Sequence, residues 1–138
     1  MSREIRWKQR FGHFDRAMVL LREPFERGLD RLSELEKEGV IQRFEFALEL
    51  GWKTIKDYME YNRIVINPVT PRQVVKEAFA AKIISDGQAW VDMLGHRNLL
   101  SHTYDQRLFE EVLKALAARY LPAFEQVHAW LLERMTEA

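Results

Sequence analysis

Residues 33–62, SELEKEGVIQRFEFALELGWKTIKDYMEYN, decide the fold class. Ser33 followed three residues later by Glu36 is a capping box, a pattern that opens a helix. We predict one long amphipathic helix that begins near Ser33, or near Val40 if Gly39 delays it, and ends near Asn62. Its apolar residues recur at steps of three or four, which places them on one helix face: Val40, Ile41, Phe44, Leu48, Trp52, Ile55 and Met59.

The segment before this helix has the same helical spacing. Pro24 falls inside it and removes the hydrogen bond to the carbonyl of Leu20, so we expect a kink or a break there. The apolar residues of this segment are Trp7, Phe11, Phe14, Met18, Leu21, Phe25, Leu29 and Leu32.

Three more helices are predicted after a connector at residues 64–70. Thr70-Pro71-Arg72-Gln73 combines a capping box with proline at the first helical position. Ser85-Asp86-Gly87-Gln88 is a further capping box, and Asp105 caps the last helix, which Pro122 should bend. About five helices with short connections and no internal repeat predict an all-α fold, an up-and-down antiparallel bundle forming a single domain over residues 1–138.

The composition excludes several classes of protein. The chain has 21 basic and 21 acidic residues, so a surface that binds nucleic acid through its overall charge is not expected, although a local patch is possible. Cysteine is absent, which excludes disulfides and thiolate metal sites. Because no signal peptide or membrane-spanning apolar run is found, we expect a cytoplasmic protein that does not bind membranes.

The segment Arg97-Asn98-Leu99-Leu100-Ser101-His102-Thr103-Tyr104 is the candidate functional site. Arg97 supplies a permanent charge for phosphate, and His102 can act as an acid or base near neutral pH. Residues five apart on a regular helix are separated by about 140°, so these two converge only if the helix ends between them or a second subunit contributes. Asn98 and His102 share one face, as do Arg97 and Ser101.

A structural alternative needs no ligand. Arg97 would pair with Asp92, and His102 would bond a backbone carbonyl near a helix end. In both cases Leu94, Leu99 and Leu100 would anchor the helix in the core, and the Tyr104 hydroxyl would be exposed. Asp92 and His96 are four apart and could share a metal, but no third ligand stands at a telling spacing, so we expect neither a metal nor a cofactor.

The segment Arg97–His102 resembles the arginine–polar–variable–histidine motif of HEPN domains, and Thr103-Tyr104 extends the match to the form paired with minimal nucleotidyltransferases. Residues 42–56 and 71–79 are also similar to the nucleotidyltransferase substrate-binding subfamily. The resemblance covers nearly the whole chain. It implies a helical bundle, a homodimer that brings two motif copies into one cleft, and a separate small nucleotidyltransferase as partner.

Two functions follow from the resemblance. In the first, the dimer cleft binds a nucleotide or nucleic-acid substrate for the partner, through Arg97, Asn98, Ser101, His102 and Tyr104, in a toxin–antitoxin-type module. In the second, the chain is a metal-independent endoribonuclease toxin with Arg97, Asn98 and His102 catalytic, silenced by modification of Tyr104. The binding subunit is slightly favoured, because residues 86–107 contain three Asp and only two Arg. A structural domain with a relic motif is the third alternative.

Other residues carry weaker expectations. Trp7, Trp52, Trp90 and Trp130 are expected to anchor the core or a dimer interface. Glu45 and Glu49 share a helix face and are expected to be solvated or ion-paired, with Glu49 the better candidate for a role in the cleft. Basic residues gather near the N-terminus, and the sequence leaves open whether they approach the cleft; they are Arg3, Arg6, Lys8, Arg10, Arg16 and Arg22.

Overall fold

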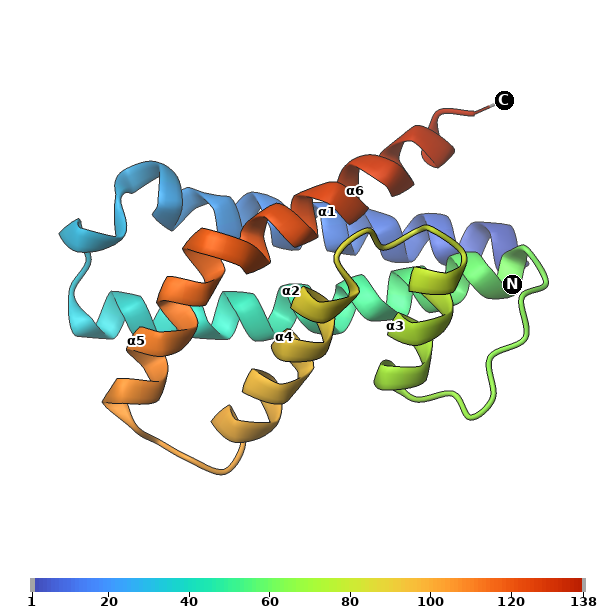
Figure 1. Ribbon diagram of the computed structural model, residues 1–138. Coiled ribbons are helices and arrows are strands. Elements are labelled where there is room, and N and C mark those ends of the chain that lie inside the picture. Colours follow the sequence, from blue (N-terminus) through green and yellow to red (C-terminus); the bar gives the residue numbers. More distant parts are fainter. Residues whose placement is uncertain (1, 138) are drawn as a thin grey trace.

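The two longest helices lie side by side and run in opposite directions in the computed structural model, which describes residues 2–137 (Figure 1). Helix α1 spans Arg3–Arg27 and helix α2 spans Glu34–Tyr61. The predicted capping box is formed: the Glu36 amide donates to the Ser33 hydroxyl, and the Ser33 amide donates to the Glu36 carboxylate. Helix α2 therefore begins well before Gly39.

Helix α1 is not broken at Pro24, contrary to one of the two expectations. It continues to Arg27 and ends at Gly28, whose φ of 99° favours glycine. The Leu20 carbonyl, which Pro24 leaves without its helical donor, accepts a hydrogen bond of 2.8 Å from the Arg43 guanidinium. A side chain of α2 thus satisfies the carbonyl and lets the helix continue, and a short 3-10 turn, Leu29–Arg31, leads to α2.

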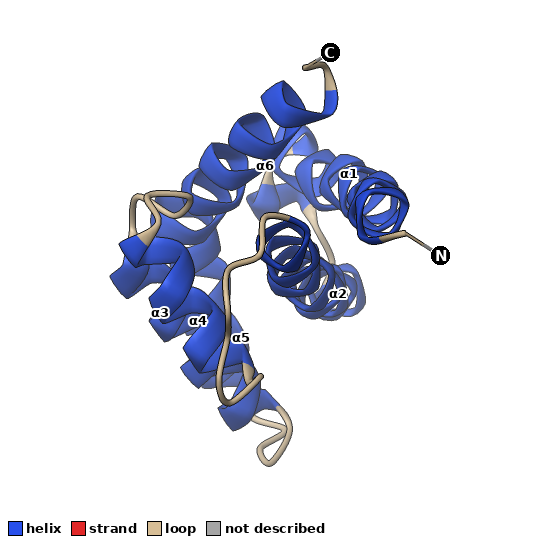
Figure 2. Ribbon diagram, turned by 90° about the vertical axis from the view of Figure 1, so that its right-hand side faces the viewer, coloured by secondary structure: helices blue, strands red, loops and turns tan. Residues whose placement is uncertain are grey.

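Three shorter helices lie on the side of α2 away from α1 (Figure 2). They are α3 (Pro71–Ala80), α4 (Gly87–Leu100) and α5 (Gln106–Ala115). Thr70 caps α3 as predicted. The predicted start of α4 is wrong by one residue. The N-cap is Asp86 rather than Ser85, because the Ala89 amide donates to the Asp86 side chain. The predicted capping box is not closed, since the Gln88 side chain bonds to Asp92 instead.

The last predicted helix is one continuous helical segment with a π-helical turn inside it. Helix α5 passes through the π segment Leu116–Tyr120 into α6 (Leu121–Met135). Pro122 has no amide hydrogen for the carbonyl four residues earlier, and the wider π turn lies where that bond is missing. The chain changes direction across this turn (Figure 1). If α5 and α6 are counted as one helix, residues 2–137 contain the five helices that the sequence predicted. The all-α bundle is thereby confirmed.

Aromatic side chains fill the centre of the bundle. Trp90 and Phe124 are fully buried, with ring centroids 5.4 Å apart in an edge-to-face arrangement. Gly51 of α2 lies where these helices meet: a Cβ there would stand 3.1 Å from the Trp90 ring and 3.2 Å from that of Phe14. No helix among the described residues has the length and apolar character needed to cross a membrane.

Candidate functional site

The candidate motif lies at the carboxyl end of α4 and in the turn that follows. Helix α4 ends at Leu100, Ser101 is its C-cap, and residues 102–105 lead to α5. Arg97 is thus on the last helical turn and His102 is beyond it. The helix ends between these two residues, one of the conditions under which both can line a shared cleft.

Arg97 is held against α2. Its guanidinium donates to the Glu49 carboxylate at 3.3 Å, and its side chain is one-quarter exposed. The same carboxylate accepts a hydrogen bond of 3.1 Å from the Trp52 indole and pairs with Lys53 at 3.0 Å. Glu49 therefore compensates part of the charge that Arg97 would offer a phosphate, and of the two glutamates considered from the sequence it is the one that bonds to the motif.

The pairing of Arg97 with Asp92 suggested by the sequence is wrong. Asp92 instead binds the guanidinium of Arg119 at 2.9 Å. His96 is also occupied, since its ring nitrogens lie 2.7 Å from the Tyr120 hydroxyl and 2.8 Å from the Glu111 carboxylate. Within residues 2–137, no group of three or more His, Asp or Glu side chains is arranged to hold a metal ion.

Asn98 and His102 are exposed, and neither side chain makes a hydrogen bond to any residue that the structure describes. The suggested bond from His102 to a backbone carbonyl is therefore not formed. The Ser101 hydroxyl donates to the Arg97 carbonyl at 2.9 Å and so closes the helix end. Leu99 does not anchor the core as expected: half of it is exposed, whereas Leu94 is buried.

Tyr104 is 82% exposed, as predicted for its hydroxyl. That hydroxyl donates to the Glu38 carboxylate on α2, a contact that the sequence did not indicate. The hydrogen bond to Glu38 raises the pKa of Tyr104, so the phenol remains protonated at neutral pH. The ring also packs edge-to-face on Phe109 with centroids 5.2 Å apart, which fixes the turn on α5.

A stripe of four carboxylates on α2 faces the motif: Glu34, Glu38, Glu45 and Glu49. Their spacing places them within about 60° around the helix axis. Three of them accept hydrogen bonds from the segment that contains the motif, from Gln106, Tyr104 and Arg97 in turn. Sequence reasoning noticed only the last two carboxylates, although the same spacing would have revealed the others. The immediate surroundings of the motif are therefore acidic.

The two carboxylates nearest Arg97 titrate differently. Burial raises the pKa of Glu45, and the charge of Arg97 only partly opposes this. Burial acts in the same direction on Glu49, but hydrogen bonds from Lys53 and Trp52 and the charge of Arg97 outweigh it, so the pKa of Glu49 is lowered. Glu49 is thus the carboxylate whose ionised form this environment stabilises.

Comparison with known proteins agrees with the fold and the resemblance. The family model described as nucleotidyltransferase substrate binding protein like matches residues 9–133. The probable ribonuclease HepT of Haemophilus influenzae is 32% identical over 98 residues, which cover 69% of this chain and 60% of that relative. A crystal structure from Thermus thermophilus superposes with a TM-score of 0.70 at 24% identity, covering 90% of this chain and 99% of that one, and shows the same fold. The chain therefore belongs to the nucleotidyltransferase substrate-binding-protein-like family of the HEPN superfamily.

Proposed function

We propose that this protein is a metal-independent endoribonuclease of the HEPN type, active as a homodimer and silenced by a separate small nucleotidyltransferase. One observation carries the proposal: His102 lies beyond the end of α4 with an exposed imidazole that bonds to no described residue. A free imidazole can accept and return a proton, which structural histidines such as His96 cannot do without losing their partners. The similarity to a probable ribonuclease supports the same activity.

The proposed reaction uses the ribose next to the scissile phosphate. His102 accepts the proton of the 2′-hydroxyl while that oxygen bonds to phosphorus. The bond from phosphorus to the 5′ oxygen breaks, and that oxygen takes a proton from the protonated His102 of the second copy, which leaves a 2′,3′-cyclic phosphate and a 5′-hydroxyl. Arg97 stabilises the charge on the phosphate oxygens once the phosphate displaces Glu49, and Asn98 orients the substrate.

A second copy of the chain completes the proposed site. One chain offers a single Arg97, which Glu49 neutralises in part, and a single free His102. Acid–base cleavage of RNA benefits from two proton-transfer groups and from concentrated positive charge. Two copies of the motif facing one another supply both.

Tyr104 is the proposed point of control. It is more exposed than the other large hydrophobic side chains near the motif, and its hydroxyl lies against Glu38. Attachment of a nucleoside monophosphate by the partner would put a phosphodiester anion beside that carboxylate. The repulsion between the two anions would displace the turn at residues 102–105 and with it His102.

A second candidate function is a non-catalytic subunit that binds a nucleotide for the partner enzyme. The ion pair between Arg97 and Glu49 and the acidic stripe favour it, because a mononucleotide needs less positive charge than an RNA backbone. Arg97, Asn98, Ser101, His102 and Tyr104 would then be contacts for the nucleotide.

Cleavage of single-stranded RNA by the purified chain, with a chelator present, separates the two functions. We expect cleavage that falls by about 100-fold or more in His102→Ala, the usual cost of losing a general acid–base, and in Arg97→Ala. Thr103→Ala, in the same exposed turn, is the matched control and should retain activity. A folded dimer that binds nucleotide but leaves RNA intact would support the binding subunit instead.

A further inference from the structure

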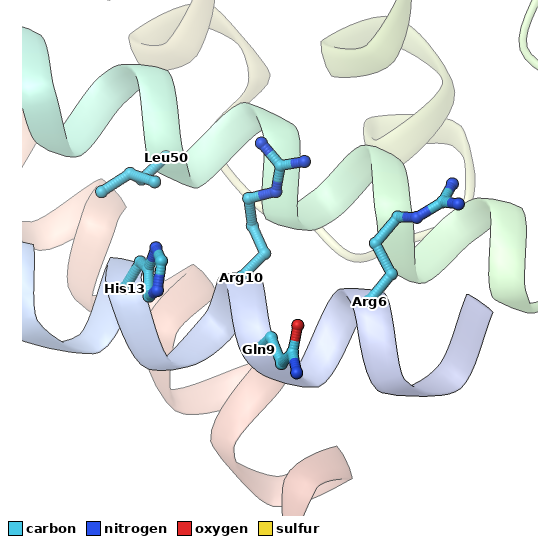
Figure 3. A pocket seen from close by; sticks show the side chains of 5 residues that line it. All are labelled: Arg6, Gln9, Arg10, His13 and Leu50. Atoms are coloured by element: carbon cyan, nitrogen blue, oxygen red, sulfur yellow. The ribbon is translucent and has the colours of Figure 1, made fainter. Parts of the chain in front are cut away.

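A groove between α1 and α2 contains two of the basic residues of the N-terminal segment. It encloses about 660 Å³ and is lined by Arg6, Gln9, Arg10 and His13 of α1 and by Leu50 of α2. Figure 3 shows the Arg6 and Arg10 side chains extending from α1 across the groove toward α2, with His13 near Leu50. The four α1 residues stand at positions i, i+3, i+4 and i+7, so they share one helix face.

Most hydrogen-bond donors of this groove are unoccupied. Arg10 donates to the buried carboxylate of Asp57 at 3.0 Å and is thereby fixed in place. Arg6, Gln9 and His13 are not engaged by any residue from 2 to 137 through side-chain hydrogen bonds or ion pairs. They can therefore bind a ligand without breaking a contact in the protein.

The acidic residues of the same part of α1 lie elsewhere and have partners. Glu4 pairs with Lys8 at 3.7 Å and accepts a hydrogen bond of 2.8 Å from Tyr61. Asp15 lies 2.7 Å from the ring of the buried His128. The residues that line the groove thus include two arginines and no carboxylate, although the whole chain has a net charge of zero.

The groove is connected to the motif by α2. Lys53 lies between Leu50 and Glu49 around the helix, about 60° from the first and 40° from the second at 100° per residue. Leu50 lines the groove, and Glu49 binds Arg97. Lys53, which is one-third exposed and pairs with Glu49 at 3.0 Å, therefore continues the row of cations from α1 to the motif.

We infer that this groove binds the backbone of single-stranded RNA and leads it to Arg97 and His102. The inference rests on the proposed ribonuclease function and specifies its substrate as an extended strand rather than a mononucleotide. The acidic stripe around the motif offers little attraction to a polyanion, so the affinity must come from cations farther away. From Arg6 to His13 the groove extends about 10 Å along α1, more than one phosphate requires.

The side chains of the groove suit RNA better than an acidic protein surface. Beside Arg10, on the side away from Arg6, lie an imidazole and the apolar Leu50, surfaces against which bases stack (Figure 3). The Gln9 amide can donate to and accept from a base edge. A surface that binds only the carboxylates of a protein partner would need cations but no stacking surface and no amide.

Binding is tested in the His102→Ala background, which prevents cleavage, by fluorescence anisotropy with an oligouridylate of about twelve nucleotides. Arg6→Glu is expected to lower the affinity about five- to ten-fold at low salt and to reduce the slope of log K against log salt by about 0.7 for one lost contact. Binding of uridine monophosphate should not change. His13→Glu is the second variant; Arg10 is left intact because it neutralises the buried Asp57.

Lys76→Glu is the matched control, because Lys76 is exposed on α3, across α2 from the groove, and forms no ion pair within residues 2–137 (Figure 2). If Arg6→Glu and Lys76→Glu lower the affinity for RNA equally, the assignment of the groove to RNA is overturned, while the ribonuclease proposal remains intact. If Arg6→Glu leaves RNA binding unchanged but abolishes the complex with the nucleotidyltransferase, the groove is a protein interface, and this result would also overturn the assignment of the groove to RNA. If the parent chain binds no RNA at all, both proposals fail.

Discussion

Glu45 and Glu49 show how environment separates two identical residues. They lie one turn apart on the same face of α2 and both approach Arg97, yet their pKa values move in opposite directions. Glu45 is disfavoured as an anion by burial, so its folded-state pKa exceeds the unfolded value and its charge destabilises the fold at neutral pH. Glu49 has a lowered folded-state pKa, so its ionisation stabilises the fold at neutral pH, and this stabilisation is lost as the pH falls through that pKa.

Neutralising the two residues should therefore have opposite effects. We expect Glu45→Gln to raise the thermal unfolding midpoint at pH 7 and Glu49→Gln to lower it. Each change in the free energy of unfolding should be less than about 1 kcal/mol, because both side chains are partly exposed. The effect of Glu49→Gln should shrink as the pH falls below 4.5, the ordinary value for a glutamate, because the Glu49 carboxylate of the unfolded chain begins to protonate there before that of the folded protein. Thermal melts at pH 7 and pH 4 measure this, and shifts of the same sign in both variants would contradict it.

Helix α2 organises the molecule as an element, because each of its faces meets a different partner. One face packs on α1, another carries the carboxylates that hold the motif, and between them Gly51 lets the rings of Trp90 and Phe14 approach the backbone. Gly39, on the same helix, has open space where a side chain would project. Glycine is unfavourable inside a helix, so Gly51 is explained by close packing and Gly39 is not.

The two glycines provide a matched test of that packing. Gly39→Ala should stabilise the protein by up to about 1 kcal/mol, the difference in helix propensity. Gly51→Ala gains the same propensity but pushes a methyl group against two fully buried aromatic rings, an overpacking that costs about 1–3 kcal/mol, so net destabilisation is expected. Urea denaturation measures both changes, and a Gly51→Ala variant as stable as Gly39→Ala would show that the rings can move aside.

In the whole molecule, the motif lies at an edge of the fold rather than in an enclosed pocket. The turn at residues 101–105 and the start of α5 project beyond α2 (Figure 2). His102 and Asn98 face solvent there, and Arg97 reaches back to α2. Such an open arrangement does not exclude water from a reacting phosphate, which is a physical reason for proposing that a second copy covers it.

A mixing experiment tests whether the active site is shared between copies. Arg97→Ala and His102→Ala chains, each inactive alone, are unfolded together and refolded as a mixture. Mixed dimers carry one Arg97 and one His102 on different copies, so RNA cleavage partly returns if the two motif copies share one cleft and one of each residue suffices for a reduced rate. Refolded wild-type chain controls for recovery. Mixed dimers, identified by mass spectrometry, that remain inactive would show that one Arg97 and one His102 on different copies do not make an active site.

Much of the fold was predictable from the sequence, because helix formation is encoded locally. The apolar spacing and the Ser33–Glu36 box correctly predicted α2, and Thr70-Pro71 correctly predicted α3. The start of α4 was missed by one residue because Ser85 and Asp86 are both good capping residues and only backbone geometry selects between them. The continuity of α1 through Pro24 depends on Arg43, which no local pattern relates to Leu20.

The sequence by itself determined the helices, the family and the short motif from Arg97 to Tyr104, because periodicity, caps and motif spacing are properties of neighbouring residues. Only the tertiary structure decided what that motif touches. Arg97 binds Glu49, 48 positions away, and Tyr104 binds Glu38, 66 positions away, out of 21 acidic residues in the chain. Which carboxylate reaches which cation depends on how the helices cross, and that is set by the packing of the whole core rather than by local sequence.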